Sequence, residues 1–307
     1  MQISVISPVY MAEKIVPELV KRISEELRLI STDFEIILVD DCGPDNSWKE
    51  IKKQCKKYKF VKGIKLSRNF GQHYAVSAGI AKATGDNIVL MDCDLQDNPR
   101  DIHKLLEKRN EGYEVVFTER IKRKHSALKT IIAFIYNKLF TLFSGGDYHI
   151  NAGSLVLFSK RVGLEFNKLE DKDRLYLQML KWIGFKSTVV AVNHDKRLEG
   201  KSSYNFIKLL KIGIQGWTSH SDKLLKFSVY LGTILSFVSF IAGILIIIKY
   251  FFYNLQPGWP SIIVTILFST GLILLSVGVM GLYIGKIFEQ SKNRPLYIID
   301  EEINVND

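Results

Sequence analysis

Two long uncharged stretches near the end of the chain constrain the fold more than any other feature. Residues 227–248 and 250–285 contain no Asp, Glu, Lys or Arg, whereas residues 1–226 carry charges throughout. Each stretch supplies about 20 apolar residues, the length needed to cross roughly 30 Å of hydrocarbon. Two such stretches in tandem leave too little protein to bury both in a soluble core. The sequence therefore predicts transmembrane helices at 227–249 and 260–285.

Basic residues around these stretches predict their orientation. They lie at the outer ends of the two spans (Lys223, Lys226, Lys286, Lys292 and Arg294), whereas the connection 250–260 has no Lys or Arg. By the positive-inside rule, both termini are expected in the cytoplasm. Residues 1–8 lack the basic start and long apolar core of a signal peptide. We therefore expect a multi-pass protein of the inner (cytoplasmic) membrane, with a cytoplasmic domain at 1–225 and a cytoplasmic tail at 286–307.

The charge balance narrows the class of partner. A net charge of +10 favours either nucleic acid or an anionic membrane surface. The two predicted spans favour the membrane, so no nucleic-acid partner is expected. Cys42, Cys55 and Cys93 show no metal-binding spacing, and a cytoplasmic domain would keep them reduced.

The first 118 residues alternate short apolar runs with helical periodicity. The expected strands are 3–7, 34–39, 61–66, 87–91 and 113–117. Apolar residues recur at helical spacing over 16–30, and further helices are expected at 51–58 and 72–83. This alternation predicts an α/β domain whose mainly parallel sheet is covered on both faces. Ligands bind such sheets beyond the carboxyl ends of the strands.

Two amphipathic segments lie outside this alternation. Residues 125–143 follow a basic run and carry an apolar stripe, and residues 205–220 precede the first span. We expect both to lie in the membrane interface. For residues 125–143, a helix packed in the core of the domain is the alternative.

Carboxylates follow two of the expected strands. Asp92-Cys93-Asp94 comes directly after the strand at 87–91, and Asp40-Asp41 ends the strand at 34–39. Two carboxylates spaced by one residue at a strand end can hold Mg²⁺ or Mn²⁺ together with a diphosphate. A solvated turn is the alternative interpretation of such a pair. The domain has neither the glycine pattern of dinucleotide oxidoreductases nor a P-loop.

Ordered short motifs run through the whole chain. They are Ser7-Pro8-Val9-Tyr10, Val39-Asp40-Asp41 with Asp45 and Ser47, Arg68-Asn69-Phe70-Gly71-Gln72, Asp92-Cys93-Asp94-Leu95-Gln96-Asp97, Arg197-Leu198-Glu199-Gly200-Lys201-Ser202-Ser203-Tyr204, and Arg294-Pro295-Leu296-Tyr297. The first two resemble the nucleotide-binding start of family 2 glycosyltransferases. The others resemble the branch that contains dolichol-phosphate mannose synthase and the bacterial polyprenyl-phosphate glycosyltransferases. The resemblance implies a GT-A-like fold followed by two membrane helices.

The same resemblance implies an activity. It is the inverting transfer of a sugar from a nucleotide-diphosphate sugar to a polyprenyl phosphate, with Mg²⁺ or Mn²⁺ as cofactor. Undecaprenyl phosphate is preferred to dolichyl phosphate, because the chain is compact and rich in lysine. The sugar and the nucleotide stay open, and a homo-oligomer is compatible with the glycines of the two spans.

Roles for individual residues come from matching positions in the family. The nucleotide would contact Pro8, Tyr10, Asp40, Asp41, Arg68, Gln72 and Asp92. A metal would be held by Asp94 with Gln96, and Asp97 would lie next to them. The acceptor phosphate would contact Arg120, Arg197, Ser202 and Tyr204. Asp92, Asp94, Arg120 and Arg197 would then be the catalytic set, although Arg120 is equally well explained as a surface charge.

Some features depart from the family pattern and keep alternatives open. Family members commonly carry an Asp in the segment that corresponds to residues 149–155, where this chain has Asn151 and Ser154. An acceptor phosphate that is already an anion needs no such base. Glu170 and Arg174 form either an ion pair or an acceptor contact. The rival functions are a membrane scaffold that retains the fold and a processive polysaccharide synthase, although Gln215-Gly216-Trp217 is only a fragment of the motif typical of such synthases.

Overall fold

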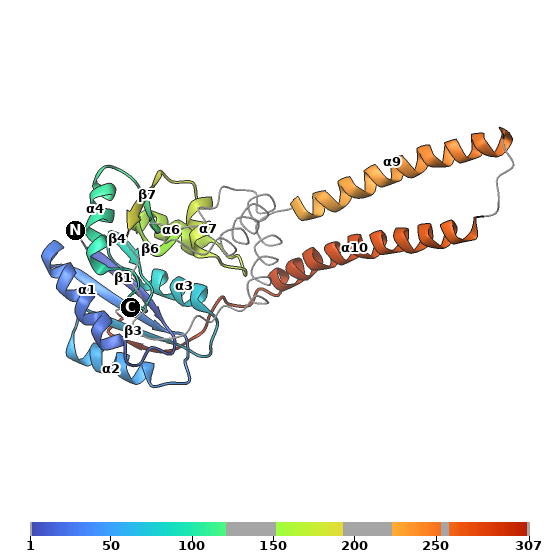
Figure 1. Ribbon diagram of the computed structural model, residues 1–307. Helices are drawn as coiled ribbons and strands as arrows, with labels where there is room; N and C mark the ends of the chain where they lie inside the picture. The colour runs from blue at the N-terminus through green and yellow to red at the C-terminus, as the bar shows by residue number, and fades with distance from the viewer. Residues whose placement is uncertain (1, 121–151, 193–222, 253–257, 306–307) are drawn as a thin grey trace. The chain divides into compact units, whose positions relative to one another are not determined.

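A computed structural model describes residues 2–120, 152–192, 223–252 and 258–305 (Figure 1). The chain divides into two compact units. The first comprises Met1–His125, Tyr148–Ser203 and Arg294–Asp307, and the second comprises Ser126–Asp147 and Tyr204–Asn293. The interfacial helices expected near 125–143 and 205–220 lie outside the described residues.

The first unit is built on an eight-stranded sheet in the order β7-β5-β6-β4-β1-β2-β3-β8. Its centre consists of β1 (Ile3–Val9), β2 (Phe34–Asp40), β3 (Val61–Leu66) and β4 (Asn87–Leu90). These four strands pair in parallel, with β1 between β2 and β4. The sequence predicted all four, and the expected α/β class with a mainly parallel sheet is confirmed.

The flanks of the sheet bring in antiparallel pairing. β5 (Val115–Arg120), which the sequence also predicted, pairs with β6 (Ala152–Ser159) and with the edge strand β7 (Ser187–Val192). β6 runs antiparallel to β4 and β5, whereas β7 is parallel to β5. At the other edge, β8 (Ile299–Ile303) runs antiparallel to β3. The region expected to be a simple tail at 286–307 therefore contributes a strand to the sheet.

Helices cover both faces of the sheet because successive strand residues point to opposite sides. Ile36 and Leu38 of β2 pack with α1 (Val16–Ile30), α2 (Ser47–Lys57) and α4 (Ile102–Asn110), which follows the short 3₁₀ helix η1 (Pro99–Asp101). Ile37 and Val39 face the layer of α3 (Gln72–Lys82), α6 (Lys160–Lys168) and α7 (Tyr176–Trp182). The domain core therefore lies in two layers around β1, β2 and β4.

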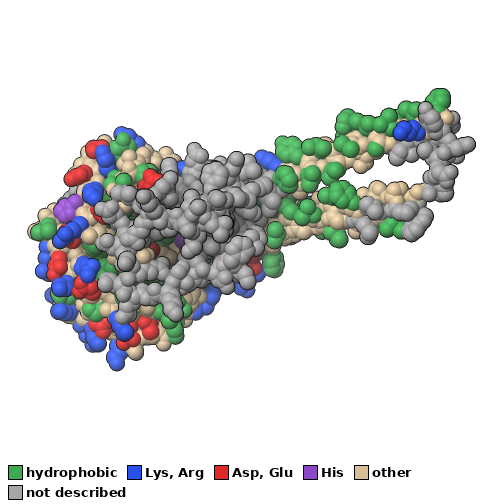
Figure 2. All heavy atoms as spheres, in the orientation of Figure 1, with side chains coloured by type: hydrophobic (Ala, Val, Ile, Leu, Met, Phe, Trp, Pro, Cys, Tyr) green, Lys and Arg blue, Asp and Glu red, His purple; other side chains and the backbone are tan. Residues whose placement is uncertain are grey.

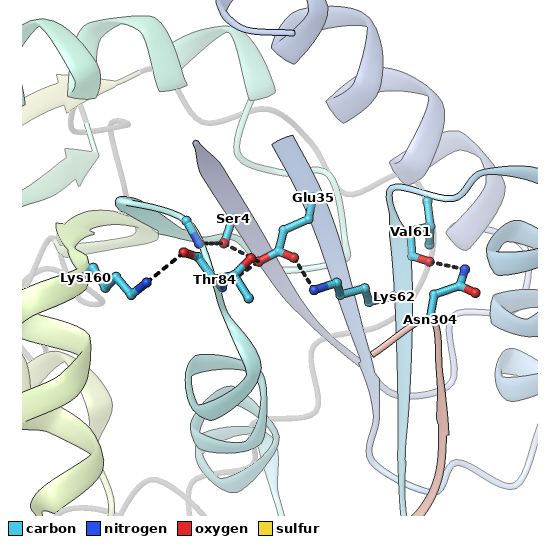
Figure 3. A network of polar contacts seen from close by, with 8 residues as sticks. Ser4, Glu35, Val61, Lys62, Thr84, Lys160 and Asn304 are labelled. Atoms are coloured by element: carbon cyan, nitrogen blue, oxygen red, sulfur yellow. Dashed lines mark hydrogen bonds and ion pairs between the residues drawn. The ribbon is translucent and has the colours of Figure 1, made fainter. Parts of the chain in front are cut away.

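A buried ion pair fastens the amino ends of the central strands (Figure 3). Glu35 of β2 pairs with Lys62 of β3 at 2.5 Å and accepts hydrogen bonds from Ser4 Oγ of β1 and from Thr84 before β4. Burial by itself would raise the pKa of Glu35, but the hydrogen bonds from Lys62, Ser4 and Thr84 lower it below its usual value. This network lies at the edge of the sheet opposite to the acidic clusters.

The second unit contains two long apolar helices, α9 (Lys223–Phe252) and α10 (Trp259–Ser291). By length and composition, Leu225–Ala242 and Ser261–Ser291 are each able to cross a membrane. Hydrophobic side chains lie exposed along both helices, among them Phe237 at 65% and Leu274 at 65% (Figure 2). Apolar exposure on this scale indicates a lipid-facing surface and therefore membrane association.

Candidate active site

The two acidic clusters follow strands that flank β1. Asp40 and Asp41 lie at the end of β2, and Asp92 and Asp94 follow β4. Backbone hydrogen bonds continue the pairing to this edge, from Asp41 N to Val9 O at 2.9 Å and from Met91 N to Ile6 O at 3.0 Å. The carboxylates thus share the carboxyl edge of the central parallel strands, where α/β sheets bind ligands.

Backbone strain gathers at the same edge. Met11, Cys42 and Leu95 adopt left-handed conformations with φ of 52°, 53° and 55°. They follow β1, β2 and β4 respectively. Non-glycine residues rarely adopt this conformation, and such strain concentrates at functional sites. These three turns were not predicted from the sequence, although Gly43-Pro44 after Cys42 does signal a turn.

Asp41 holds a loop. Its Oδ1 accepts the backbone N–H of Phe70 at 2.8 Å, and its Oδ2 accepts that of Gly71 at 2.9 Å. Burial raises the pKa of Asp41, and the two amide donors act in the opposite direction. Since both oxygens are engaged, the carboxylate fixes the start of α3. The nucleotide contact expected of Asp41 stays a prediction.

Asp45 and Ser47 fasten a second loop. Asp45 Oδ2 accepts hydrogen bonds from Glu13 N at 3.1 Å and from Ser47 Oγ at 2.8 Å. Ser47 Oγ in turn accepts from Ala12 N at 3.0 Å. These contacts join the loop after β1 to the loop after β2. The two residues belong to a motif for which nucleotide binding was expected, and the structure shows their side chains joining these two loops.

Asp40 presents a buried oxygen to the site. Its side chain is 2% exposed, and Oδ1 has no partner among the described residues. Burial raises the pKa of Asp40 to about 6, with the Gly43 amide opposing the rise and Asp45 adding to it. Buried oxygens without a partner are rare in folded proteins and call for a ligand or water. Asp40 is therefore well suited to accept a hydrogen bond from a bound molecule.

The carboxylates after β4 are more accessible. Asp92 and Asp94 are both half-buried. Gln72 Nε2 at the start of α3 donates to Asp92 Oδ1 at 2.6 Å. Asp94 Oδ1 accepts the backbone N–H of Gln96 at 3.1 Å, which closes a tight turn. The structure thus brings Gln72 and Asp92 into direct contact.

The remaining nucleotide candidates line the same edge. Pro8 is buried within β1, whereas Tyr10 is 46% exposed just beyond it. The exposed Arg68 guanidinium lies over the Phe70 ring, 4.1 Å from its centroid. Phe70 is the residue whose amide binds Asp41, so Arg68 sits on the loop that Asp41 holds.

Two other candidates have structural contacts. Asp97 is 2% exposed and accepts a hydrogen bond from Ser154 Oγ of β6. Arg174 is 3% exposed and donates to Leu169 O at 2.6 Å and Phe166 O at 3.3 Å. The guanidinium thereby caps the carboxyl end of α6.

The side chains at this edge can be compared with the ligands that a divalent metal ion requires. Within the described ranges, no group of three or more His, Cys, Asp or Glu side chains gathers to hold an ion. Mg²⁺ commonly binds one or two carboxylates and completes its shell with waters and substrate phosphates. Asp92 and Asp94, half-buried and close in sequence, fit that second kind of site.

The candidate acceptor residues fall largely outside the described chain. Arg197, Ser202 and Tyr204 lie in 193–222, and Asn151 lies in 121–151. Arg120 ends β5, but its side chain is likewise not described. The roles expected for these residues therefore stay predictions.

Comparisons with known proteins bear on this site. The family model described as "Glycosyl transferase family 2" matches residues 4–163. "Uncharacterized glycosyltransferase YkcC" of Bacillus subtilis is 35% identical over 99% of this chain and 95% of its own length. The "Bactoprenol glucosyl transferase" of Shigella phage SfV is 33% identical over 98% of this chain and 99% of its own length.

A solved structure shares the fold. Glucosyl-3-phosphoglycerate synthase from Mycobacterium tuberculosis, in complex with Mn²⁺ and UDP-glucose, superimposes with a TM-score of 0.50. The match covers 71% of this chain and 77% of that one at 14% sequence identity. The likeness confirms the expected GT-A-like architecture.

Proposed function

Because the chain belongs to glycosyl transferase family 2, we propose that it transfers a sugar from a nucleotide-diphosphate sugar to a polyprenyl phosphate. The observation that carries the proposal is its similarity to bactoprenol glucosyl transferases over 98% of the chain. That similarity extends through the two apolar helices, which a soluble acceptor would not require. Undecaprenyl phosphate is the acceptor we favour. Glucose is the first sugar to test, because several relatives are bactoprenol glucosyl transferases.

The donor would bind at the carboxyl edge of β1, β2 and β4. Oδ1 of Asp40, which has no partner among the described residues, suits an N–H or O–H of the nucleoside; Pro8 lies on the neighbouring strand and Tyr10 just beyond its end. Asp92, held by Gln72, would face the sugar or the diphosphate. Asp94, with Gln96 beside it, would hold Mg²⁺ or Mn²⁺. The metal would supply Lewis-acid stabilisation of the negative charge on the departing nucleotide diphosphate.

The acceptor needs little activation. A phosphate monoester is an anion at neutral pH, so its oxygen attacks the anomeric carbon without a strong base. The carbon–oxygen bond to the nucleotide diphosphate breaks as the new bond forms, and the configuration at the anomeric carbon inverts. Arg120 and Arg197 would hold the acceptor phosphate in line, because guanidinium groups offer forked and permanently charged donors. This route needs no catalytic base, which agrees with the presence of Asn151 and Ser154 in the segment where family members commonly carry an Asp.

The proposal includes a membrane arrangement. The positive-inside rule assigns the first unit and both termini to the cytoplasmic side, with α9 and α10 spanning the membrane. A cytoplasmic site has access to nucleotide sugars, and the anchor keeps it next to the lipid acceptor.

The test is transfer of labelled sugar from a panel of nucleotide sugars into undecaprenyl phosphate, with Mg²⁺, Mn²⁺ or EDTA. We expect one donor to give an acid-labile lipid product that EDTA suppresses. Asp94→Asn should abolish this transfer, whereas Asp86→Asn, a carboxylate near the opposite edge of the sheet, should not. Near-normal turnover of Asp94→Asn would contradict the assignment of Asp94 as a metal ligand. A wild-type chain that binds no nucleotide would favour the scaffold function.

A second pair of variants tests the acceptor site. Arg197→Ala should raise the KM for undecaprenyl phosphate far more than it weakens nucleotide binding. Arg100→Ala removes an arginine whose side chain is 78% exposed and pairs with Glu26, so it serves as the control. A defect of Arg197→Ala confined to nucleotide binding would place the acceptor elsewhere.

A further inference from the structure

The segment after the second apolar helix returns to the sheet beside the candidate active site. We call residues 294–304, which include β8, the C-terminal strap. β8 pairs with β3 from Gly63 opposite Ile303 to Leu66 opposite Ile299. The pairing continues past the end of β3, because Ser67 N donates to Ile298 O at 2.9 Å. The strap therefore reaches the loop that follows β3.

Side chains fasten the strap along its whole length. Lys65 binds Asp300 at 2.7 Å, and Lys82 of α3 binds Glu302 at 3.1 Å. Trp48 Nε1 of α2 donates to Glu301 Oε2 at 3.0 Å. Asn304 Nδ2 donates to Cys55 O and to Val61 O, both at 2.9 Å, and Figure 3 shows the bond to Val61. Each acidic residue of the strand thus has a partner on a different element.

A second attachment joins the start of the strap to α3. Lys172 Nζ donates to Arg294 O, and Tyr74 OH on the first turn of α3 donates to Lys172 O. Tyr297 packs against the core layer that contains α3, and its burial raises its pKa. The strap therefore holds the segment 67–74 from both ends.

This held segment carries the contacts that organise the candidate donor site. Phe70 and Gly71 supply the amides that bind Asp41, and Gln72 binds Asp92. Arg68 lies between these residues and the strap-bound Ser67. A displacement of the loop would therefore move both acidic clusters.

We propose that the C-terminal strap is a positioning element for donor binding: through Ser67 and Tyr74 it fixes the loop that orients Asp41 and Asp92. The inference rests on the proposed function, since it takes the ligand of this edge to be a nucleotide sugar. It also gives a role to Arg294-Pro295-Leu296-Tyr297, which the transfer chemistry leaves without one. The strap continues the chain from the end of α10, and a hydrogen bond from Ser67 N to Ile298 O joins it to the donor loop.

Two variants of the full-length chain loosen the strap at side chains that are not themselves candidate site residues. Asp300→Lys places like charges together at Lys65. Asn304→Gly removes two hydrogen bonds, and glycine keeps the left-handed φ of 58° without strain. Glu111→Lys is the matched control, because the two ion pairs are alike. Glu111 is 51% exposed in a 2.8 Å pair with Lys108, and Asp300 is 46% exposed in a 2.7 Å pair with Lys65.

The measurements are the KM for donor and acceptor, UDP and GDP binding with Mn²⁺, and deuterium exchange in peptides covering 67–71. We expect both strap variants to raise the donor KM and weaken nucleotide binding about three- to tenfold, as about 0.7–1.4 kcal/mol of lost positioning gives. Exchange at Phe70 and Gly71 should accelerate. The acceptor KM should stay unchanged, and Glu111→Lys should match the wild type throughout.

Two results would overturn the proposal. Unchanged donor affinity despite faster exchange in 298–304 would mean that the strap does not act on the loop. An equal rise in the donor KM and the acceptor KM, with a lower Tm, would mean that the strap only supports the edge of the sheet. A wild-type chain that binds no nucleotide would instead overturn the proposed function. In that case exchange at 67–71 would still decide whether the strap holds the loop.

Discussion

The side-chain amide of Gln72 donates to Oδ1 of Asp92 at 2.6 Å and so joins the first turn of α3 to the acidic segment after β4. Gln72 is exposed, so little of the protein's stability depends on it. Its importance lies in the orientation of Asp92. An ionised carboxylate that accepts one fixed donor has fewer rotamers open to it.

Gln72→Leu should therefore lower transfer without unfolding the chain. Hydrogen bonds to charged groups contribute about 1.5–3 kcal/mol, so kcat/KM for the donor should fall about 10- to 100-fold. Gln54→Leu is the control, because Gln54 Nε2 binds Glu50 Oε1 on α2, away from the site. Equal activity of Gln72→Leu and wild type would show that Asp92 is oriented by other contacts.

Asp40→Asn should stabilise the protein while weakening nucleotide binding. Burial raises the pKa of Asp40 from its usual 3.8 to about 6 in the folded chain, so the folded state binds the proton more tightly. Its stabilising effect is complete below pH 3.8 and is lost as the pH rises through 6. The Asn variant, which stays neutral, should gain about 1–2 kcal/mol over the wild type at pH 8.

Thermal unfolding of both proteins in detergent at pH 5, 6.5 and 8 checks this sign. The difference in Tm should grow with pH and level off above pH 7. A difference that is constant over this range would mean that Asp40 is not titrating in the folded protein. Nucleotide binding at pH 8 should be weaker in the variant, because the amide offers one oxygen in place of a carboxylate.

The sequence predicted that the two acidic clusters lie at the carboxyl ends of central strands, because an apolar run ending in Asp marks the end of a buried strand. The sequence could not show that Asp40 and Asp41 have different roles. Both residues lie at the end of β2, but Asp40 Oδ1 has no partner among the described residues, whereas Asp41 binds two amides of a loop thirty residues further along the chain. Such a division of roles depends on a long-range contact.

The strand β8 escaped prediction for a similar reason. Its sequence, Ile-Asp-Glu-Glu-Ile, has the acidic composition of a solvated tail and little β-propensity. It forms a strand because Lys65, Lys82 and Trp48, distant in sequence, meet its three carboxylates. The sequence of β8 alone does not reveal which distant residues will pair with it.

Cys42 offers a test of backbone strain at the site. It adopts a left-handed φ of 53°, which glycine tolerates and β-branched residues resist. Cys42→Gly should be close to neutral, whereas Cys42→Val should destabilise the protein by about 1–3 kcal/mol. Because Cys42 follows Asp41, Cys42→Val should also weaken nucleotide binding. Equal Tm values for the two variants would contradict the strained turn.

The Glu35–Lys62 pair predicts a different response, confined to stability. Both side chains are nearly buried, at 5% and 11% exposure. Lys62→Met should therefore cost about 3–5 kcal/mol, because it leaves the Glu35 charge buried without its partner. The double variant Glu35→Gln/Lys62→Met should recover much of this loss, since the amide oxygen still accepts from Ser4 or Thr84.

The pH dependence gives the independent check. The pKa of Glu35 lies below its usual value of 4.5, so its contribution is complete above pH 4.5 and is lost as the pH falls through the lowered pKa. Unfolding measured at pH 7 and pH 4 should show the gap between wild type and the double variant narrowing in acid. Nucleotide affinity should be the same in all folded variants, because the pair lies at the opposite edge of the sheet from the site. A loss of nucleotide affinity without a loss of stability would mean that this ion pair influences the donor site through the strands that it joins.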